Sequence, residues 1–263
     1  MCGTCGCNVT PGNNHLIEAG GKLHADGTID VLKNLLHEND HTAAHNREHF
    51  YQHQVLVINL MSSPGSGKTA LLETTIDSLS SDYRIAVIEG DLETENDAQR
   101  IRKHGVPAIQ IETGTACHLD AHLIHDAIHQ LNLDEIDILF IENVGNLVCP
   151  ASFDLGQHFN VTLLSTTEGD DKPAKYPVIF RAADLVLITK QDLLVVLDDF
   201  EPDKATHHLR QLSNPAPVIC LSSKTGFAIE QWCEWIITQA KTLSDSEQQG
   251  KADEAKPSKV LAG

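Results

Sequence analysis

Residues 55–79 read VLVINLMSSPGSGKTALLETTIDSL, and this stretch decides the fold of the chain. An apolar run, 55–60, leads into the loop SSPGSGKT, 62–69, and a helix-like segment follows over 68–79. The loop is close to the P-loop pattern G-x-x-x-x-G-K-[ST] and stands in the strand–loop–helix context that the pattern requires. Its first position is Ser62 where the pattern has glycine, a position that shapes the turn and is expected to make little direct contact. The sequence therefore predicts a phosphate-binding loop after a buried strand.

The residues of this loop have separate predicted roles. Pro64, Gly65, Ser66 and Gly67 are expected to surround phosphate oxygens, because the two glycines let backbone N–H groups close around an anion. Lys68 is expected to reach the β- and γ-phosphates, and the Thr69 hydroxyl is expected to bind Mg²⁺. The alternative is a Gly/Ser turn with an incidental lysine, which the strand before it and the helix after it disfavour.

Outside this stretch, short apolar runs alternate with helix-like segments. Near-continuous apolar runs of this length are typical of strands buried on both faces, so the pattern predicts an α/β fold with a doubly wound, mostly parallel sheet. The runs are 55–60, 85–89, 108–112, 137–142, 161–166, 184–189 and 218–222, and helices are expected over 68–79, 95–103, 119–131, 202–212 and 228–243. We divide the chain into a flexible metal-binding N-terminus with a His-rich linker, 1–54, a P-loop domain, 55–243, and a polar tail expected to be disordered, 244–263.

More nucleotide-binding residues are expected where later strands end, because ligands of open α/β sheets bind outside the carboxyl ends of the strands. Asp91 and Glu142 each end a strand and are predicted to join Thr69 around Mg²⁺, and Gly145 offers a backbone N–H able to sense the γ-phosphate. With Lys68, these three Mg²⁺ ligands form the predicted catalytic set.

Two further elements point to the base. The tetrapeptide 189–192, TKQD, resembles the guanine-reading N/T-K-x-D element of GTPases, and 222–224, SSK, resembles their S-A-K element. Lys190 and Asp192, with Ser223 and Lys224, are therefore predicted to bind the base of GTP or GDP. Since all these elements occur in the right order at strand ends, a GTPase is favoured over an ATP-dependent kinase or synthetase.

Cysteines gather at two places. Cys2, Cys5 and Cys7 fall within six residues, where three thiolates can wrap one soft or borderline ion, with square-planar Ni²⁺ and tetrahedral Zn²⁺ as competitors. Cys117 and His118 follow one strand and Cys149 follows another, so the three are expected to meet as a second metal site on the nucleotide face. For Cys220 and Cys233 the expected role is that of a small buried hydrophobe.

Histidines form a third pattern. Five of them are spaced four residues apart, so that neighbouring pairs on a helix could chelate one ion: His37, His41, His45, His49 and His53. A solvated linker helix that merely tolerates histidine explains the spacing equally well. Three more, His122, His125 and His129, are interpreted as surface or interface residues.

Composition narrows the class of protein. The formal net charge is -18, from 19 Lys+Arg against 37 Asp+Glu, and about -14 of it falls on residues 55–243. Nucleic acid and anionic membranes both bind positively charged proteins most strongly, so neither is expected as the main partner. No secretory signal is recognised, and the longest apolar runs are too short to span a bilayer. A cytoplasmic location with reduced thiols is expected.

Taken together, the terminal C-x-x-C-G-C, the SSPGSGKT loop, the Cys117–His118 pair and the segment NVGNLVCP, 143–150, resemble the hydrogenase nickel-incorporation GTPases of the HypB family. The resemblance covers residues 1–7 and 55–243 and implies a nickel metallochaperone of [NiFe] hydrogenase maturation that hydrolyses GTP slowly. It implies a tight nickel site at Cys2, Cys5 and Cys7, and a Ni²⁺/Zn²⁺ site at Cys117, His118 and Cys149 near a nucleotide-dependent dimer interface.

The same resemblance implies the partners: a second copy of the chain, hydrogenase-maturation accessory proteins and the hydrogenase large subunit. From the residues, the apolar run 193–197 is too apolar for an exposed loop, so Leu193 and Leu197 are expected to contribute to a homodimer contact. The alternative function is a nickel or zinc buffer with a regulatory nucleotide site, which the retention of Lys68, Thr69, Asp91 and Asp192 disfavours.

Overall fold

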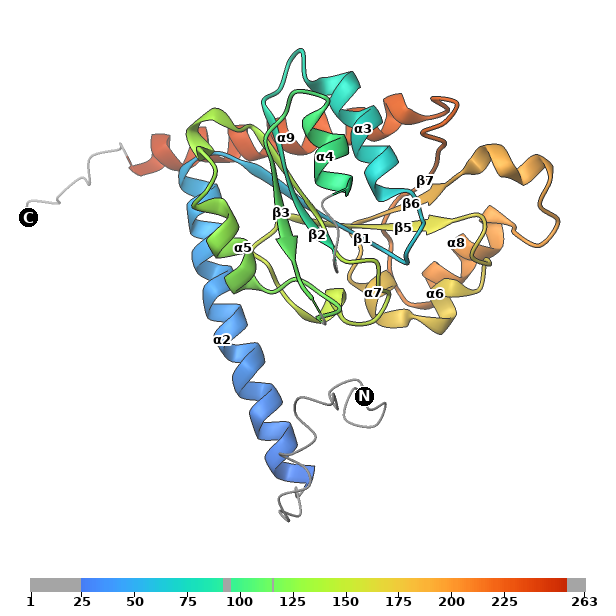
Figure 1. Cartoon of the computed structure of the whole chain (residues 1–263), viewed down its shortest axis with the longest axis horizontal. Coiled ribbons are helices and arrows are strands. Elements are labelled where there is room, and N and C mark those ends of the chain that lie inside the picture. The colour runs from blue at the N-terminus through green and yellow to red at the C-terminus, as the bar shows by residue number, and fades with distance from the viewer. Residues whose placement is uncertain (1–24, 92–95, 115, 255–263) are drawn as a thin grey trace, which may run out of the picture.

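A seven-stranded parallel sheet runs through the middle of the molecule (Figure 1). The computed structural model describes residues 25–91, 96–114 and 116–254, with side chains over 36–91, 96–114 and 116–245. The strand order is β3-β2-β4-β1-β5-β6-β7. The strands are β1 (Leu56–Ser62), β2 (Ile85–Asp91), β3 (Ala108–Glu112), β4 (Ile138–Glu142), β5 (Phe159–Ser165), β6 (Leu185–Thr189) and β7 (Val218–Cys220), so each of the seven predicted runs forms a strand.

Helices cover both faces of this sheet, which confirms the doubly wound fold. One face packs against α3 (Lys68–Leu79), α4 (Asn96–Arg102) and α9 (Ile229–Glu254). The other packs against α2 (Ala25–Gln52) and α5 (Ala121–Ile128) at one end and against α7 (Pro177–Arg181) and α8 (Pro202–Gln211) at the other. The short helix α6 (Lys172–Lys175) precedes α7.

The central strand β1 shows how the sequence produces this arrangement. Leu56, Ile58 and Leu60 point into the core beneath α3 and α9, whereas Val57 and Met61 point to the opposite face. A strand with apolar side chains on both faces is stable only between two layers of helices. Since β1 is flanked by β4 and β5, the loop that follows it opens at the centre of the carboxyl edge of the sheet.

Helix α2 lies on the domain, although the sequence placed its histidines in a separate linker. Ala43 and Phe50 are fully buried, and the buried Asn46 donates from Nδ2 to the carbonyl of Ala121 on α5 at 2.8 Å. The blue and green helices lie side by side in Figure 1. The second half of α2 is therefore part of the packed domain.

At the other end of the chain, α9 continues beyond the expected 228–243. Residues 244–254 are helical, where a disordered tail was expected, and residues 255–263 lie outside the described part. Trp232 anchors the helix, since its Nε1 donates to Thr75 Oγ1 of α3 at 2.9 Å. Among the helices described, none is both long and apolar enough to cross a bilayer.

His158 is expected to destabilise the folded chain in mild acid. Its Nδ1 accepts the backbone N–H of Val57 at 3.0 Å, and burial, helped by nearby Arg47, lowers its pKa from 6.5 to about 4. The unfolded chain binds this proton more readily, so stability is complete above about pH 6.5 and is lost as the pH falls toward 4. We expect the free energy of unfolding to fall by about 1 kcal/mol from this residue between about pH 7.5 and pH 5.5.

Urea denaturation of the wild type and of His158→Gln, in the presence of a chelator, measures this effect. The variant should lose less stability than the wild type over that pH interval. His207→Gln, a change on the surface helix α8, is the matched control. Its free energy of unfolding should change with pH as that of the wild type does. Equal slopes for His158→Gln and the wild type would show that His158 is not responsible.

Candidate functional site

The P-loop, residues 62–69, joins the carboxyl end of β1 to the first turn of α3. Gly65 and Gly67 have φ values of +74° and +96°, a left-handed conformation that glycine adopts without strain. The N-terminus of α3 faces into the loop, where the helix dipole and its N–H groups favour an anion. A pocket of about 390 Å³ lies here, lined by the loop together with Asp91, Glu142 and Gly145. The structure thus brings together the residues assigned to the phosphates and to Mg²⁺.

Lys68 and Thr69 are held by their neighbours inside this pocket. The Lys68 side chain is buried, with Nζ 3.1 Å from Ser62 Oγ and 3.9 Å from Glu142 Oε1. Thr69 Oγ1 donates to the same Glu142 oxygen at 3.0 Å. Ser62 therefore contacts the lysine directly, which corrects the expectation that this position only shapes the turn. Its hydroxyl positions Nζ in a way that the glycine of the usual pattern cannot.

Two buried carboxyl groups lie side by side next to Lys68. Glu89 and Glu142 occupy paired positions on β2 and β4 and are 2% and 3% exposed. Burial, followed by the charge of Glu142, raises the pKa of Glu89 far above its usual range, and burial also raises the pKa of Glu142. Glu89 Oε2 and Glu142 Oε2 have no hydrogen-bond partner among the described residues. Buried carboxylate oxygens of this kind are the ligands that Mg²⁺ prefers.

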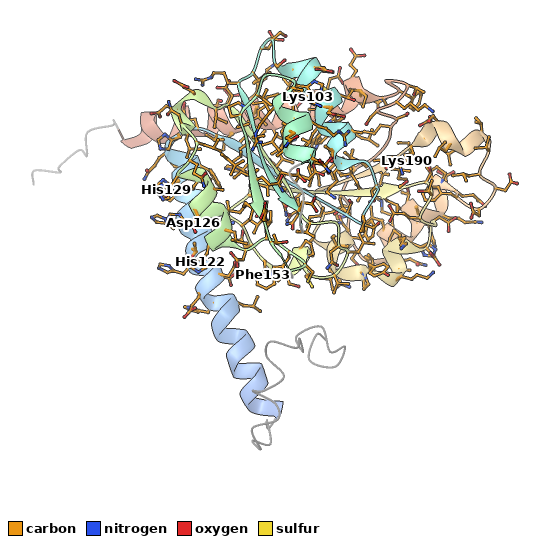
Figure 2. The ribbon with its side chains drawn as sticks, viewed as in Figure 1. Lys103, His122, Asp126, His129, Phe153 and Lys190 are labelled. Atoms are coloured by element: carbon orange, nitrogen blue, oxygen red, sulfur yellow. The ribbon has the colours of Figure 1, made fainter. Side chains whose placement is uncertain are left out.

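The residues predicted to bind the base line a second pocket, of about 280 Å³, that adjoins the first at Gly67 and Ala70. Its lining includes all four of the residues predicted to bind the base: Lys190, Asp192, Ser223 and Lys224. Figure 2 labels Lys190 at the far side of the molecule from α2. The two pockets are therefore continuous, with the predicted phosphate-binding residues in one and the predicted base-binding residues in the other.

Two hydrogen bonds fix this second pocket against the P-loop, and a third orients Asp192 within it. Thr189 Oγ1 donates to the carbonyl of Ser66 at 2.7 Å, and Lys190 Nζ donates to the carbonyl of Gly65, also at 2.7 Å. Ser222 Oγ holds one carboxylate oxygen of Asp192 at 2.6 Å. Thr189, at a position where asparagine is commoner in such elements, therefore connects the predicted base-binding loop to the P-loop.

Cys117, His118 and Cys149 meet at the same edge of the sheet. One ligand atom from each lies within 4.8 Å of the others, and all three residues are partly buried. The two Sγ atoms are 3.1 Å apart, well beyond a disulfide bond of about 2.05 Å. The His118 ring stacks on Phe153 at 3.9 Å, and burial lowers its pKa, so the neutral imidazole can act as a ligand. Two thiols and an imidazole suit a borderline divalent ion.

Short contacts connect this metal cluster to the P-loop. Gly145 lies so close to the loop that a Cβ atom placed on it would be 2.9 Å from Pro64 Cα. The next residue, Asn146, donates from Nδ2 to the carbonyl of Cys117 at 3.2 Å. Cys149 follows on the same segment. These contacts form a short path from the P-loop to two of the three predicted metal ligands, Cys117 and Cys149.

The comparisons with known proteins agree with this geometry. Residues 56–220 match the CobW/HypB/UreG nucleotide-binding domain. The hydrogenase maturation factor HypB of Escherichia coli (strain K12) is 49% identical over 227 residues, 84% of this chain and 77% of that protein. The chain belongs to the HypB family. The HypB of Azotobacter vinelandii is 47% identical over 235 residues, 88% of this chain and 77% of that protein.

Solved HypB structures share the fold. The crystal structure of HypB from Helicobacter pylori in complex with nickel superposes with a TM-score of 0.75 at 43% identity, over 78% of this chain and 96% of that one. The crystal structure of HypB from Archaeoglobus fulgidus superposes with a TM-score of 0.73 at 38% identity, over 78% of this chain and 100% of that one. The predicted P-loop fold and the predicted family are both confirmed.

Glu168 contacts the P-loop, although no motif in the sequence predicts it there. Its carboxylate accepts hydrogen bonds from the Ser66 hydroxyl at 2.6 Å and from the backbone N–H of Ser165 at 3.0 Å, and it also contacts the Ser63 hydroxyl. The one signal available was its place just after the apolar run 161–166, at the edge where other strand ends carry site residues. A carboxylate here repels phosphate, so we expect it to shift when a nucleotide binds.

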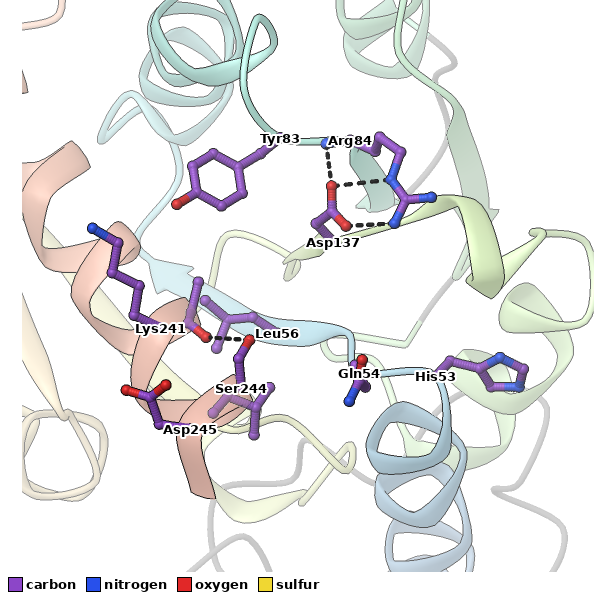
Figure 3. Close-up of a pocket in the computed structure, with 11 residues that line it drawn as sticks. His53, Gln54, Leu56, Tyr83, Arg84, Asp137, Lys241, Ser244 and Asp245 are labelled. Atoms are coloured by element: carbon purple, nitrogen blue, oxygen red, sulfur yellow. Dashed lines mark hydrogen bonds and ion pairs between the residues drawn. The ribbon is translucent and has the colours of Figure 1, made fainter. Parts of the chain in front are cut away.

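A pocket of about 370 Å³ at the opposite edge of the sheet has a different character (Figure 3). It contains two cationic side chains, Lys241 and Arg84, and the Arg84 guanidinium is already paired, because it bonds Asp137 from Nε at 3.0 Å and through a second nitrogen at 2.5 Å. This pocket also lies at the amino ends of the strands. Because ligands of open α/β sheets bind at the carboxyl ends, the nucleotide is expected at the other edge. The predicted site at Cys2, Cys5 and Cys7 falls outside the described residues.

Proposed function

We propose that the chain is a GTP-hydrolysing nickel chaperone that helps to insert Ni²⁺ into [NiFe] hydrogenase during its maturation. The observation that carries the proposal is the Cys117–His118–Cys149 cluster, connected to the P-loop through Gly145 and Asn146. The relatives named above are hydrogenase maturation factors, and one solved relative is a complex with nickel. Accessory maturation proteins and the hydrogenase large subunit are the partners that this role requires.

In this proposal the chain's own residues bind and orient GTP. The backbone of the P-loop surrounds the phosphates, Lys68 neutralises the developing charge, and Asp192 selects guanine. Mg²⁺ fits Thr69, Asp91 and Glu142, which line one pocket with an unsatisfied buried oxygen. When bound, the ion neutralises phosphate charge.

Nickel is the proposed cargo, and its affinity depends on the nucleotide. The γ-phosphate attracts the backbone N–H of Gly145. A shift of this residue moves Asn146 and Cys149 relative to Cys117. Linkage then requires that nickel change the affinity for GTP by the same factor as GTP changes the affinity for nickel. Cys2, Cys5 and Cys7 are proposed as a separate, tighter nickel site. Zn²⁺ is the competing ion at both sites.

The test titrates Ni²⁺ into the full chain carrying Cys2→Ala, Cys5→Ala and Cys7→Ala, once with GDP and once with a non-hydrolysable GTP analogue. We expect the two affinities to differ by about 5- to 150-fold, the usual range of coupling between two sites. Adding Gly145→Ala should remove most of the difference, because its Cβ would collide with Pro64. Equal affinities for the two nucleotides in the parent would refute the proposed coupling.

We also propose that the chain forms a nucleotide- or metal-dependent homodimer through residues 193–197. Val195 and Val196 are 87% and 71% exposed, while Leu193 and Leu197, predicted at the contact, are partly buried. An exposed apolar pair beside the base pocket is typical of a protein interface. The valines therefore join the leucines as candidate contact residues.

Replacing both Val195 and Val196 by Asp should weaken self-association at least about tenfold, because two charges would have to be desolvated in the contact. Sedimentation velocity with the GTP analogue and Ni²⁺ measures the change. Val178→Asp, at an equally apolar and 52% exposed position on α7, should leave association unchanged. An unaltered dimer in the double variant would exclude this surface.

A further inference from the structure

Four histidines meet where α2 packs against α5, and we call them the histidine cluster. His45 and His49 lie one turn apart on α2, and His125 lies on α5 one turn before His129, which caps the end of that helix. The ring centroids are 4.6 Å apart within the first pair, 4.5 Å within the second, and 5.1–6.0 Å between helices. Figure 2 labels His122, Asp126 and His129 along α5, at the side of the molecule that α2 covers. Two helices thus bring two imidazoles each to one surface. Among the described residues, three ligand atoms already lie within 4.8 Å of one another at Cys117, His118 and Cys149, so the histidine cluster closes on an ion by rotation of its side chains.

Buried Asn46 determines which nitrogen of His125 is available. Both protons of its side-chain nitrogen have carbonyl acceptors, Ala121 O at 2.8 Å and Leu155 O at 3.2 Å. Its Oδ1 therefore accepts, and His125 Nδ1, 3.0 Å away, must be the N–H that donates. In the neutral ring the lone pair is then on Nε2. A fixed outer hydrogen bond of this kind orients the histidine ligands of metal sites.

The lone pair of His125 Nε2 faces His129 Nε2 at a distance of 3.1 Å. Two nitrogens each about 2.1 Å from one ion, at an angle of about 90° to 110°, are about 3.0–3.4 Å apart. A hydrogen bond between the two rings accounts for this distance as well. It does not account for the two histidines on α2, whose ring centroids lie 5.1–6.0 Å from those of His125 and His129.

The charge state of the cluster also suits a cation. Burial, followed by the neighbouring histidines, lowers the pKa values of both His49 and His125, so these rings are neutral near pH 7. Neutral imidazoles offer lone pairs, whereas protonated ones repel one another. His45 and His129 are exposed, which gives an ion a path from solvent.

We propose that the histidine cluster is an imidazole-only site for a borderline divalent ion, Ni²⁺ or Zn²⁺. Imidazole ligands select such ions over Mg²⁺ and Ca²⁺, which prefer oxygen. His125 is the oriented ligand, His129 pairs with it on α5, and His45 and His49 complete the site from α2. The bound ion ties α2 to the domain. This inference goes beyond the proposed function and does not depend on nucleotide binding.

The test uses the full chain with Cys2, Cys5, Cys7, Cys117 and Cys149 all replaced by Ala, which removes the thiol sites. Ni²⁺ alone, and Zn²⁺ alone in a second arm, are titrated by calorimetry, and X-ray absorption reports the ligands. We expect one tight site with imidazole and no sulfur signature, and a melting temperature that rises with the ion. Adding His45→Ala and His129→Ala should weaken binding at least about 100-fold and abolish the thermal shift.

His37→Ala with His41→Ala is the matched control, since it removes two exposed histidines of the same helix at the same spacing but outside the cluster. This control should keep both the affinity and the thermal shift. The proposal is overturned if the control loses binding as strongly as the cluster variant, if the cluster variant keeps its affinity, or if the cysteine-free parent binds neither ion. Far-UV circular dichroism verifies that each variant is folded.

Discussion

Asp192→Asn is expected to change the nucleotide preference of the chain from guanine to xanthine. Ser222 holds one oxygen of this carboxylate at 2.6 Å, so the side chain has a fixed orientation in the pocket that also contains Lys190. A carboxylate accepts the N1–H and the C2 amino group of guanine. Asparagine keeps one acceptor but presents N–H₂ in place of the other, which opposes that amino group and matches the C2 carbonyl of xanthine. The GTP affinity should fall at least about 100-fold, as expected when buried polar groups lose their partners.

Competition of GTP, XTP and ATP against a fluorescent GDP analogue measures the switch. Asp198→Asn is the matched control, because it removes the same charge from an exposed position in the same loop. Its nucleotide preference should stay that of the wild type. If Asp192→Asn binds GTP as before and does not prefer XTP, guanine is not recognised at this position, and an ATP-dependent activity becomes the better explanation.

The sheet could be predicted almost completely from the sequence, for a physical reason. A parallel strand covered by helices on both sides must be apolar on both faces. Each of the seven strands is therefore a continuous apolar run in the sequence, which can be recognised without knowing which strands lie beside it. The P-loop and the strand-end residues followed, since carboxyl ends of parallel strands share one edge. These are local patterns combined with one rule of topology.

What could not be predicted depends on which strands and helices become neighbours. Glu89 was read as part of a strand end, but its buried pairing with Glu142 follows only from β2 lying next to β4. The contact of Gly145 with Pro64 likewise joins two separate loops. The histidine spacing on α2 was visible, yet its meaning depended on α5, because half of the cluster comes from each helix. His125 and His129 had been interpreted only as surface or interface residues.

Lys68→Ala is expected to lower GTP hydrolysis by about 100- to 1000-fold, the usual effect of removing one preorganised charge from a transition state. The buried ammonium lies 3.9 Å from Glu142 and favours the ionised forms of both Glu142 and Glu89. Without it, the pKa values of these two carboxyls rise further. Glu142 then takes up a proton more readily, which spares the fold an unmatched buried charge. Activity should therefore fall much more than stability.

Phosphate release at saturating GTP and Mg²⁺, together with urea denaturation, separates the two effects. Lys103→Ala is the matched control, because it removes a lysine from an exposed position, which Figure 2 labels at the top of the molecule. It should leave both the rate of GTP hydrolysis and the free energy of unfolding unchanged. Hydrolysis by Lys68→Ala should not recover at higher Mg²⁺, because the ion does not replace the ammonium that stabilises the transition state. If Lys68→Ala keeps the wild-type rate, the P-loop is not catalytic. The chain would then be better explained as a nickel or zinc buffer whose nucleotide site is regulatory.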